Sequence, residues 1–421
     1  MVIATTTDDR GVDTARRSTA KSEALYKAAE AVMPISAGGP LTGGTAVEPG
    51  SGAVFATPIL ERGKGCRVTD VDGEEYVDYT AAGGVNILGY GDQRVAAAIN
   101  KAIFKGGALG TLSSSHLRLA ELLVSRIPSL KMVRFVASRG QALLAALDIA
   151  RRVTGRRRVI TFSQRSGAID DAVELPYNDR ATFEGCFAEI GDTVAAIVLE
   201  PVFVDRGLAR AEDEFVTALR RACDESSALL IVDESMTAFR AAGSGQTTTC
   251  NVPVDLMLLG GVLSGGLPLA ALGGRADLMK QAAAIGPAGE PTESAGLPAI
   301  AAGLAALEAM AEPGFHEALE ASSAKLDKGL REAARLAQVP TVHARVGSLV
   351  GIYFPVEPVE NTAGAVVCDA TRFARFHGAM LDRGVLLTPD PLGCMFVSAA
   401  HGDEAIEQTV AAAREAMDNL P

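Results

Sequence analysis

Short apolar runs bounded by turn residues alternate with segments of helical periodicity between residues 79 and 311. Such runs predict buried strands because they are short and rich in leucine, valine and isoleucine; the predicted strands are residues 159–162, 195–200, 229–233, 256–259 and 269–272. The alternation predicts an α/β fold with a mostly parallel sheet covered by helices. Ligands bind such sheets at the carboxyl ends of the strands, and Glu200, Asp233 and Gly261 lie at these ends.

Among the predicted helices, residues 141–153 should bury one face that carries Leu143, Leu144, Leu147 and Ala150. Residues 22–33 form another predicted helix, with Ser22 as its N-cap, Leu25 on its buried face and Pro34 at its end. The hairpin of residues 62–78 should turn at Asp72-Gly73.

Beyond residue 311 the pattern changes to helices at 317–336 and 370–383, with strands near 348–354, 385–387 and 395–398. This indicates a smaller α+β domain. We therefore expect four parts: a disordered arm (1–21), a segment packing with the small domain (22–78), a large domain (79–311) and the C-terminal small domain (312–421).

The net charge and the composition exclude several classes of binding partner. The net charge of −12 argues against nucleic acid and anionic membranes, which require basic surfaces. The six cysteines form no CxxC pair, which favours a reducing cytoplasm and no metal site. We expect neither a signal peptide nor a transmembrane helix, so the predicted partners are small molecules or other proteins.

Several ordered motifs point to one family. They are Arg62-Gly-Lys-Gly, Asp70-Val-Asp-Gly, Met132-Val-Arg-Phe-Val, Val198-Leu-Glu-Pro, Val232-Asp-Glu-Ser-Met-Thr-Ala-Phe-Arg240 and Gly265-Gly-Leu-Pro. With them the chain resembles class III, fold-type I pyridoxal-phosphate (PLP) aminotransferases, and among these the glutamate-1-semialdehyde 2,1-aminomutases, from about Ser22 to Leu420. The resemblance implies a seven-stranded sheet in the large domain and a homodimer.

The resemblance also assigns residues to a cofactor site. The lysine that holds PLP as a Schiff base corresponds to Gly261, and no lysine occurs within residues 255–279. Ser138, Arg139 and Gly140 correspond to the turn that binds the cofactor phosphate, Asp233 to the partner of the pyridine nitrogen, and Thr292 to a threonine that reaches the neighbouring subunit's phosphate. Because glycine has no amine, we expect no covalent cofactor, although PLP or its amine form (PMP) could bind noncovalently.

Other family contacts are replaced here. The ring-covering aromatic pair corresponds to Ser166-Gly167, the substrate-side Ser-Trp pair to Ala82-Gly83, a mobile arginine to Thr42 and a glutamate to Gly393. The catalytic residues stay unknown, with Asp233 and His401 as candidates. Either could instead be structural, Asp233 by capping backbone N–H groups and His401 by hydrogen bonding near a strand end.

These replacements suggest three functions. Glycines at positions 83, 261 and 393 would enlarge the cleft, and Arg139 and Arg165 would make it positive. The first hypothesis is therefore a degenerate PLP site, a pseudoenzyme with respect to transamination, that binds a larger anionic molecule of specialised metabolism. It would catalyse a PLP-independent cyclisation, isomerisation or elimination. The alternatives are a non-catalytic partner subunit that forms a heterodimer with an active paralogue, and a noncovalent PLP or PMP binder with residual activity.

Overall fold

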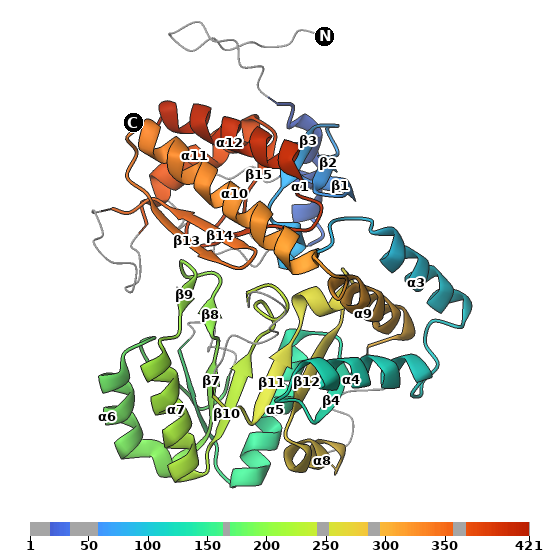
Figure 1. Ribbon diagram of the computed structural model, residues 1–421, viewed down its shortest axis with the longest axis vertical. Helices are drawn as coiled ribbons and strands as arrows, with labels where there is room; N and C mark the ends of the chain where they lie inside the picture. The colour runs from blue at the N-terminus through green and yellow to red at the C-terminus, as the bar shows by residue number, and fades with distance from the viewer. Residues whose placement is uncertain are drawn as a thin grey trace, which may run out of the picture.

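A computed structural model describes residues 17–33, 58–162, 169–241, 252–284, 295–356 and 368–420. The chain forms two bodies (Figure 1). The lower body is built on a large sheet, and the upper body contains the four-stranded and three-stranded sheets and the long C-terminal helices. The N-terminal segment, which precedes the large sheet in sequence, and the C-terminal segment, which follows it, meet in the upper body.

The large sheet has seven strands in the order β4-β12-β11-β10-β7-β5-β6. Their bounds are β4 Met132–Val136, β5 Arg158–Thr161, β6 Ala172–Glu174, β7 Val194–Leu199, β10 Leu229–Asp233, β11 Leu256–Leu259 and β12 Ala270–Gly274. The strands from β11 through β10, β7 and β5 to β6 pair in parallel, whereas β12 pairs antiparallel with β11 and β4. The predicted α/β class with a mostly parallel sheet is thus confirmed.

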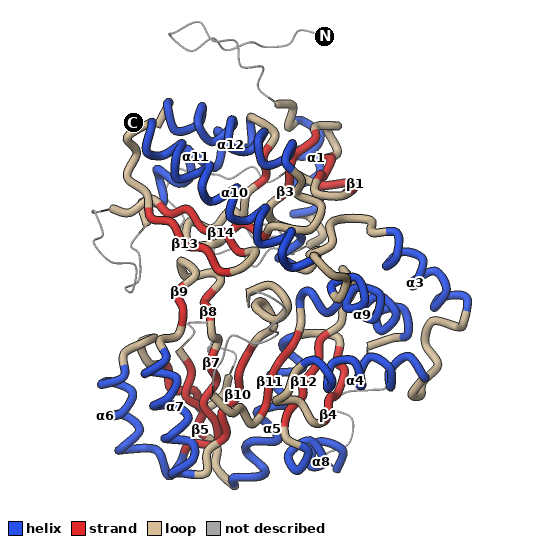
Figure 2. The backbone as a smooth tube through the Cα atoms, in the orientation of Figure 1, coloured by secondary structure: helices blue, strands red, loops and turns tan. Residues whose placement is uncertain are grey.

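Helices cover both faces of this sheet. The helices α4 (Ser114–Arg126), α6 (Arg180–Ile190) and α7 (Asp213–Ser226) bury side chains in the core on one face, and α8 (Ala276–Ala284) does so on the other face (Figure 2). The helix α5 (Arg139–Thr154) packs across the centre, against β7, β11 and β12. The lower body also contains α9 (Leu297–Met310), which packs on α3 (Gln93–Phe104) and α4.

The buried face of α5 differs from the predicted one at one position. Ala142, Ala146 and Ala150 are buried, together with Leu147. Leu144, which we expected to be buried, is 60% exposed, because the sheet contacts only the stripe of residues three or four apart that contains the alanines. Small alanine side chains let this helix approach the strands closely.

The upper body joins the two ends of the chain. Its C-terminal elements are α10 Phe315–Leu336, β13 Val342–Val346, β14 Leu349–Tyr353, α11 Ala370–Asp382, β15 Val385–Leu386, β16 Met395–Phe396 and α12 Asp403–Asp418. Its N-terminal elements are α1 Ala20–Glu30, β1 Leu60–Lys64, β2 Arg67–Asp70 and β3 Glu75–Asp78. Since β15 pairs in parallel with β3, the N-terminal segment is part of the same body. The remaining short elements are α2 Ala81–Gly84, β8 Val202–Phe203, β9 Ala209–Arg210, η2 Gly191–Thr193 and η3 Gly261–Ser264.

The start of α1 was predicted incorrectly. The helix begins after Thr19, and Ser22 lies inside it, where its hydroxyl donates a 2.9 Å hydrogen bond to the Asp72 carboxylate. Asp72 also accepts hydrogen bonds from the backbone N–H groups of Lys21 and Ser22. A carboxylate from the hairpin turn thus caps the helix, and this turns Ser22 inward and leaves the predicted core residue Leu25 45% exposed.

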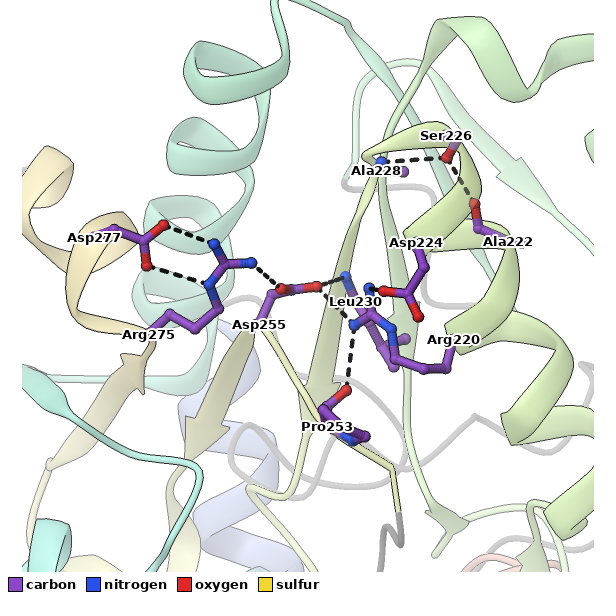
Figure 3. A network of polar contacts seen from close by, with 10 residues as sticks. All are labelled: Arg220, Ala222, Asp224, Ser226, Ala228, Leu230, Pro253, Asp255, Arg275 and Asp277. Carbon is purple, nitrogen blue, oxygen red and sulfur yellow. Dashed lines mark hydrogen bonds and ion pairs between the residues drawn. The ribbon is translucent and has the colours of Figure 1, made fainter.

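A buried carboxylate, that of Asp255, joins several elements at the edge of the large sheet where β11 begins. Asp255 accepts hydrogen bonds of 2.8 Å from Arg220 and 2.8 Å from Arg275, and it also accepts the backbone N–H of Leu230 at 2.9 Å. Figure 3 shows the carboxylate between the two guanidinium groups. This network connects α7, β10 and β11 to the segment that leads into α8.

Among the described residues, no helix is long and apolar enough to cross a membrane. The same residues contain no group of three or more metal-ligating side chains.

Candidate functional site

Two carboxylates lie close together at the carboxyl edge of the large sheet. Asp233 ends β10, and Glu200 directly follows β7, the neighbouring parallel strand. Adjacent parallel strands bring their carboxyl ends to the same edge. The side chain of Asp233 is 2% exposed and that of Glu200 is 14% exposed.

The side chain of Arg139 lies between these carboxylates. Its Nε donates to Asp233 Oδ2 at 2.6 Å, and its Nη2 donates to Glu200 Oε1 at 2.5 Å. Burial lowers the pKa of Arg139, but the charges of Asp233 and Glu200 outweigh this and raise it above its ordinary value. We expected Arg139 to add positive charge near the phosphate end; this was wrong, because two buried carboxylates neutralise that charge.

Asp233 is also used by the backbone. Its second oxygen, Oδ1, accepts the N–H of Ser235 at 3.0 Å. The structural role that the sequence left open is therefore present, together with the ion pair. Both oxygens of this carboxylate have a defined donor.

Glu200 titrates abnormally in this arrangement. Burial raises the pKa of Glu200, the charge of Arg139 lowers it and the charge of Asp233 raises it, and together they raise it from 4.5 to about 7. Two carboxylates and one guanidinium give a net negative charge when all are ionised, so a proton on Glu200 makes the group neutral.

This pKa predicts a stability that depends on pH. Between about pH 4.5 and 7, folded Glu200 keeps a proton that the unfolded chain releases, so stability falls as the pH rises. Across this window we expect wild type to lose on the order of 3 kcal/mol more than Glu200→Gln. Urea unfolding at a series of pH values measures the difference, with the exposed Glu184→Gln as control. Parallel curves for wild type and Glu200→Gln would show that Glu200 has an ordinary pKa.

The N-terminus of α5 lies beside this charge cluster. Ser138 is its N-cap, with Oγ accepting the N–H of Gln141 at 3.3 Å. A Cβ added at Gly140 would meet only Ser138 Oγ, at 3.9 Å, among the described atoms within 4 Å. A sixteen-residue helix presents N–H groups and a positive dipole end here, which suits an anion.

Gly261 follows β11 in a left-handed conformation, with φ of +48°. A Cβ at this position would lie 2.8 Å from the carbonyl oxygen of Ser235. The hydroxyl of Ser235 is buried nearby and has no hydrogen-bond partner within the described part of the chain. The backbone at residue 261 therefore favours glycine over any larger residue.

The three glycines do not all widen the cleft. Gly83 has no described atom within 4 Å of an added Cβ. Gly261 is closed by Ser235, and a Cβ at Gly393 would lie 3.0 Å from Thr388 and 3.2 Å from Asp390. The predicted enlargement is wrong at Gly261 and Gly393, because neighbouring chain fills both places.

A cavity of about 420 Å³ lies next to Gly83, between α3, α9 and the loop after η3. Its lining includes Ala82, Asn86, Tyr90, Gly266 and Leu267, but not the carboxylates at the sheet edge.

His401 has a structural role. Its Nδ1 lies 2.8 Å from Ser398 Oγ and accepts the Ser398 N–H at 3.0 Å, while its Nε2 lies 3.1 Å from the carbonyl oxygen of Asp78. The ring stacks on Tyr79, and burial lowers its pKa to about 4. His401 was a candidate catalytic residue in the sequence analysis. Because the residue is buried and both of its ring nitrogens already have partners, neither nitrogen is left to contact a substrate.

Several predicted residues lie outside the described ranges. They are Arg165, Thr292, Ser166, Gly167 and Thr42.

The pairing of Arg139 is the feature that the sequence analysis missed. A signal was available: two carboxylates were expected at one sheet edge, and an arginine occupied the turn that faces that edge. Buried carboxylates require a cation or hydrogen-bond donors, so Arg139 was the natural candidate.

Comparison with known proteins identifies the family. A family model described as aminotransferase class-III matches residues 51–168 and 166–412. The chain belongs to the class III aminotransferases. Glutamate-1-semialdehyde 2,1-aminomutase from Thermomicrobium roseum is 36% identical over 395 residues, covering 87% of this chain and 92% of that protein. The protein of the same name from Desulfosudis oleivorans is 34% identical over 430 residues, covering 95% and 99%.

A solved structure confirms the fold-type I architecture. The FumI protein of Sphingopyxis sp. MTA144, in its PLP internal aldimine form, matches with a TM-score of 0.81 at 25% identity, covering 94% of this chain and 96% of that one. The present chain thus has the aminotransferase fold that the sequence predicted.

The relatives also overturn one expectation. We predicted a PLP-independent enzyme or a pseudoenzyme, and excluded a conventional transaminase or aminomutase. That prediction is wrong: relatives about 35% identical over nearly the whole chain are named as aminomutases, which are PLP-dependent enzymes. The comparisons point to the conventional chemistry of the family.

Proposed function

We propose that this protein binds PLP or PMP noncovalently at the edge formed by β7, β10 and α5, and that it is an aminomutase or transaminase. The supporting observation is the buried Asp233 carboxylate, which already holds a cation. The guanidinium of Arg139 donates an N–H to Asp233 Oδ2 at 2.6 Å. A protonated pyridine nitrogen would offer that oxygen the same kind of charged donor.

The residues fit the cofactor at both ends. Asp233 would hold the ring nitrogen, and Ser138 with the N–H groups at the start of α5 would hold the phosphate. When bound, the ring supplies an electron sink for the substrate carbon next to nitrogen. Asp233 keeps that sink effective, because its negative charge stabilises the protonated ring nitrogen.

Gly261 provides no amine, so we propose that the cofactor is held without a covalent bond. An enzyme that lacks one positioned acid–base group is typically slower by about 10²–10⁴-fold. We therefore expect aminomutase or transaminase turnover below that of relatives by a factor of this order.

Chemical trapping tests the noncovalent part. The intact protein is incubated with PLP, reduced with borohydride, digested and examined by mass spectrometry. We expect no stoichiometric pyridoxyl adduct on any peptide, and we expect dialysis without reduction to release the cofactor. A single lysine modified in full would overturn the noncovalent proposal while leaving cofactor use intact.

The hypothesis of a larger anionic ligand stays a prediction. The open side at Gly83 favours it, but the neutralisation of Arg139 weakens the expected attraction for an anion. Competition of an extended dicarboxylate with PMP in a binding assay would test it.

A second proposal concerns the partner. Five apolar side chains are strongly exposed around the end of α3 and the start of α4: Ile103, Phe104, Leu109, Leu112 and Leu117. Phe104 is 85% exposed and Leu112 is 83% exposed. Clustered exposed apolar side chains mark interaction surfaces, and we propose that this one joins two copies of the chain.

Sedimentation velocity distinguishes the partner hypotheses. We expect a dimer for wild type and a monomer for the double variant Phe104→Glu, Leu112→Glu. A wild-type monomer that dimerises only with an active class III paralogue would instead favour the partner-subunit function.

A further inference from the structure

Arg139 occupies the place that the proposed cofactor needs. Its backbone starts α5, at the proposed phosphate site, and its guanidinium reaches the proposed partner of the ring nitrogen. The side chain therefore spans the same path as the cofactor, from helix N-terminus to Asp233.

We infer that Arg139 is a built-in competitor for the cofactor, which holds Asp233 and Glu200 while the site is free and must leave Asp233 before the pyridine ring can bind. This inference rests on the proposed function. The inference makes Arg139 a residue that sets the affinity for the cofactor, through its contact with Asp233 in the same chain.

The contacts at Asp233 make the two occupants mutually exclusive. Oδ1 is engaged by the N–H of Ser235, and Oδ2 accepts the Arg139 Nε. A charged ring N–H needs an oxygen of this carboxylate at hydrogen-bond distance. The guanidinium Nε lies 2.6 Å from Oδ2 and fills the approach to this oxygen, so the ring nitrogen can take its place only when the guanidinium has moved.

Arg139 also has a route away from Asp233. Its second contact, to Glu200 Oε1, lies on the neighbouring strand, and its side chain is 30% exposed. The guanidinium can therefore turn about the Glu200 contact toward solvent without losing both partners. Displacement costs one ion pair rather than the whole cluster.

Three variants of the intact protein test the competition. Arg139→Gly removes the side chain, Arg139→Gln keeps much of its length without charge, and Arg152→Gln removes a solvent-exposed arginine from the same helix as a control. Equilibrium dialysis measures the Kd for PMP, and circular dichroism confirms that each variant is folded.

We expect Arg139→Gly and Arg139→Gln to bind PMP at least roughly tenfold more tightly than wild type, and Arg152→Gln to match wild type. Methylguanidinium, which mimics the missing side chain, should displace PMP from Arg139→Gly. It should have little effect on Arg152→Gln, whose Arg139 already fills the position.

The outcomes separate the two proposals. Equal PMP affinity in wild type and both Arg139 variants, or weaker affinity in those variants, would overturn the competition while cofactor binding stands. Absence of PMP binding in wild type and in all folded variants would overturn the proposed function, and the competition with it. If Arg139→Gly does not fold, Arg139→Gln still decides between these results.

Discussion

Replacing Asp233 with alanine is expected to lower the free energy of unfolding by about 3 kcal/mol, and to weaken PMP binding at least roughly tenfold. The substitution removes one of the two carboxylates that pair with Arg139 and leaves the N–H of Ser235 without its acceptor. Urea unfolding and equilibrium dialysis measure the two effects.

A double variant isolates the ion pair from the rest of the change. Each single variant leaves the other member of the ion pair without its partner, whereas the double variant Asp233→Ala, Arg139→Gly removes both members. The double variant should therefore lose clearly less stability than the sum of the two single variants. Additive losses would show that the contact contributes nothing to stability. Asp233→Asn serves as the conservative comparison, since it keeps the shape of the side chain and its ability to accept a hydrogen bond.

Replacing Asp255 with alanine is expected to cost about 3–5 kcal/mol. Asp255 is the shared partner of Arg220 and Arg275 and accepts the buried N–H of Leu230 (Figure 3). Its loss would leave the buried N–H of Leu230 without its acceptor, and the mostly buried guanidinium of Arg220 would keep only Asp224 and the carbonyl oxygen of Pro253 as partners.

Asp277→Ala provides the matched control for this prediction. Asp277 also pairs with Arg275, at 2.7 Å, but its side chain is 63% exposed. Exposed ion pairs contribute roughly 0–1 kcal/mol, so we expect little change in the urea midpoint. A loss at Asp255 no larger than that at Asp277 would contradict the importance of the buried network.

The five inner strands of the large sheet could be predicted well because most of their residues are buried, whereas the more exposed edge strands β4 and β6 were not predicted. The runs 229–233 and 256–259 coincide with β10 and β11, since continuous apolar segments of this length leave few alternatives. Predictions that depended on one side of a helix were weaker. Leu144 is exposed because the sheet covers the other side of its helix, and Leu25 is exposed because Asp72 turns its helix. Both contacts involve residues far away in sequence.

The candidate site shows the same division. Parallel topology brings Glu200 and Asp233 to one edge, and this follows from the strand pattern alone. The pairing of Arg139 with Asp233 joins residues 94 positions apart and depends on how α5 packs. The incorrect expectation of PLP-independent chemistry gave one position, Gly261, more weight than the similarity of the whole chain to PLP-dependent relatives.

The most direct test of the central claim is equilibrium dialysis of PMP with the intact protein, in wild type and in Asp233→Asn. We predict saturable binding of one PMP per chain that dialysis reverses, with the affinity at least roughly tenfold lower in Asp233→Asn. Equal affinity in the two proteins, or no saturable binding to folded wild type, would contradict the assignment of Asp233 as the partner of the cofactor ring.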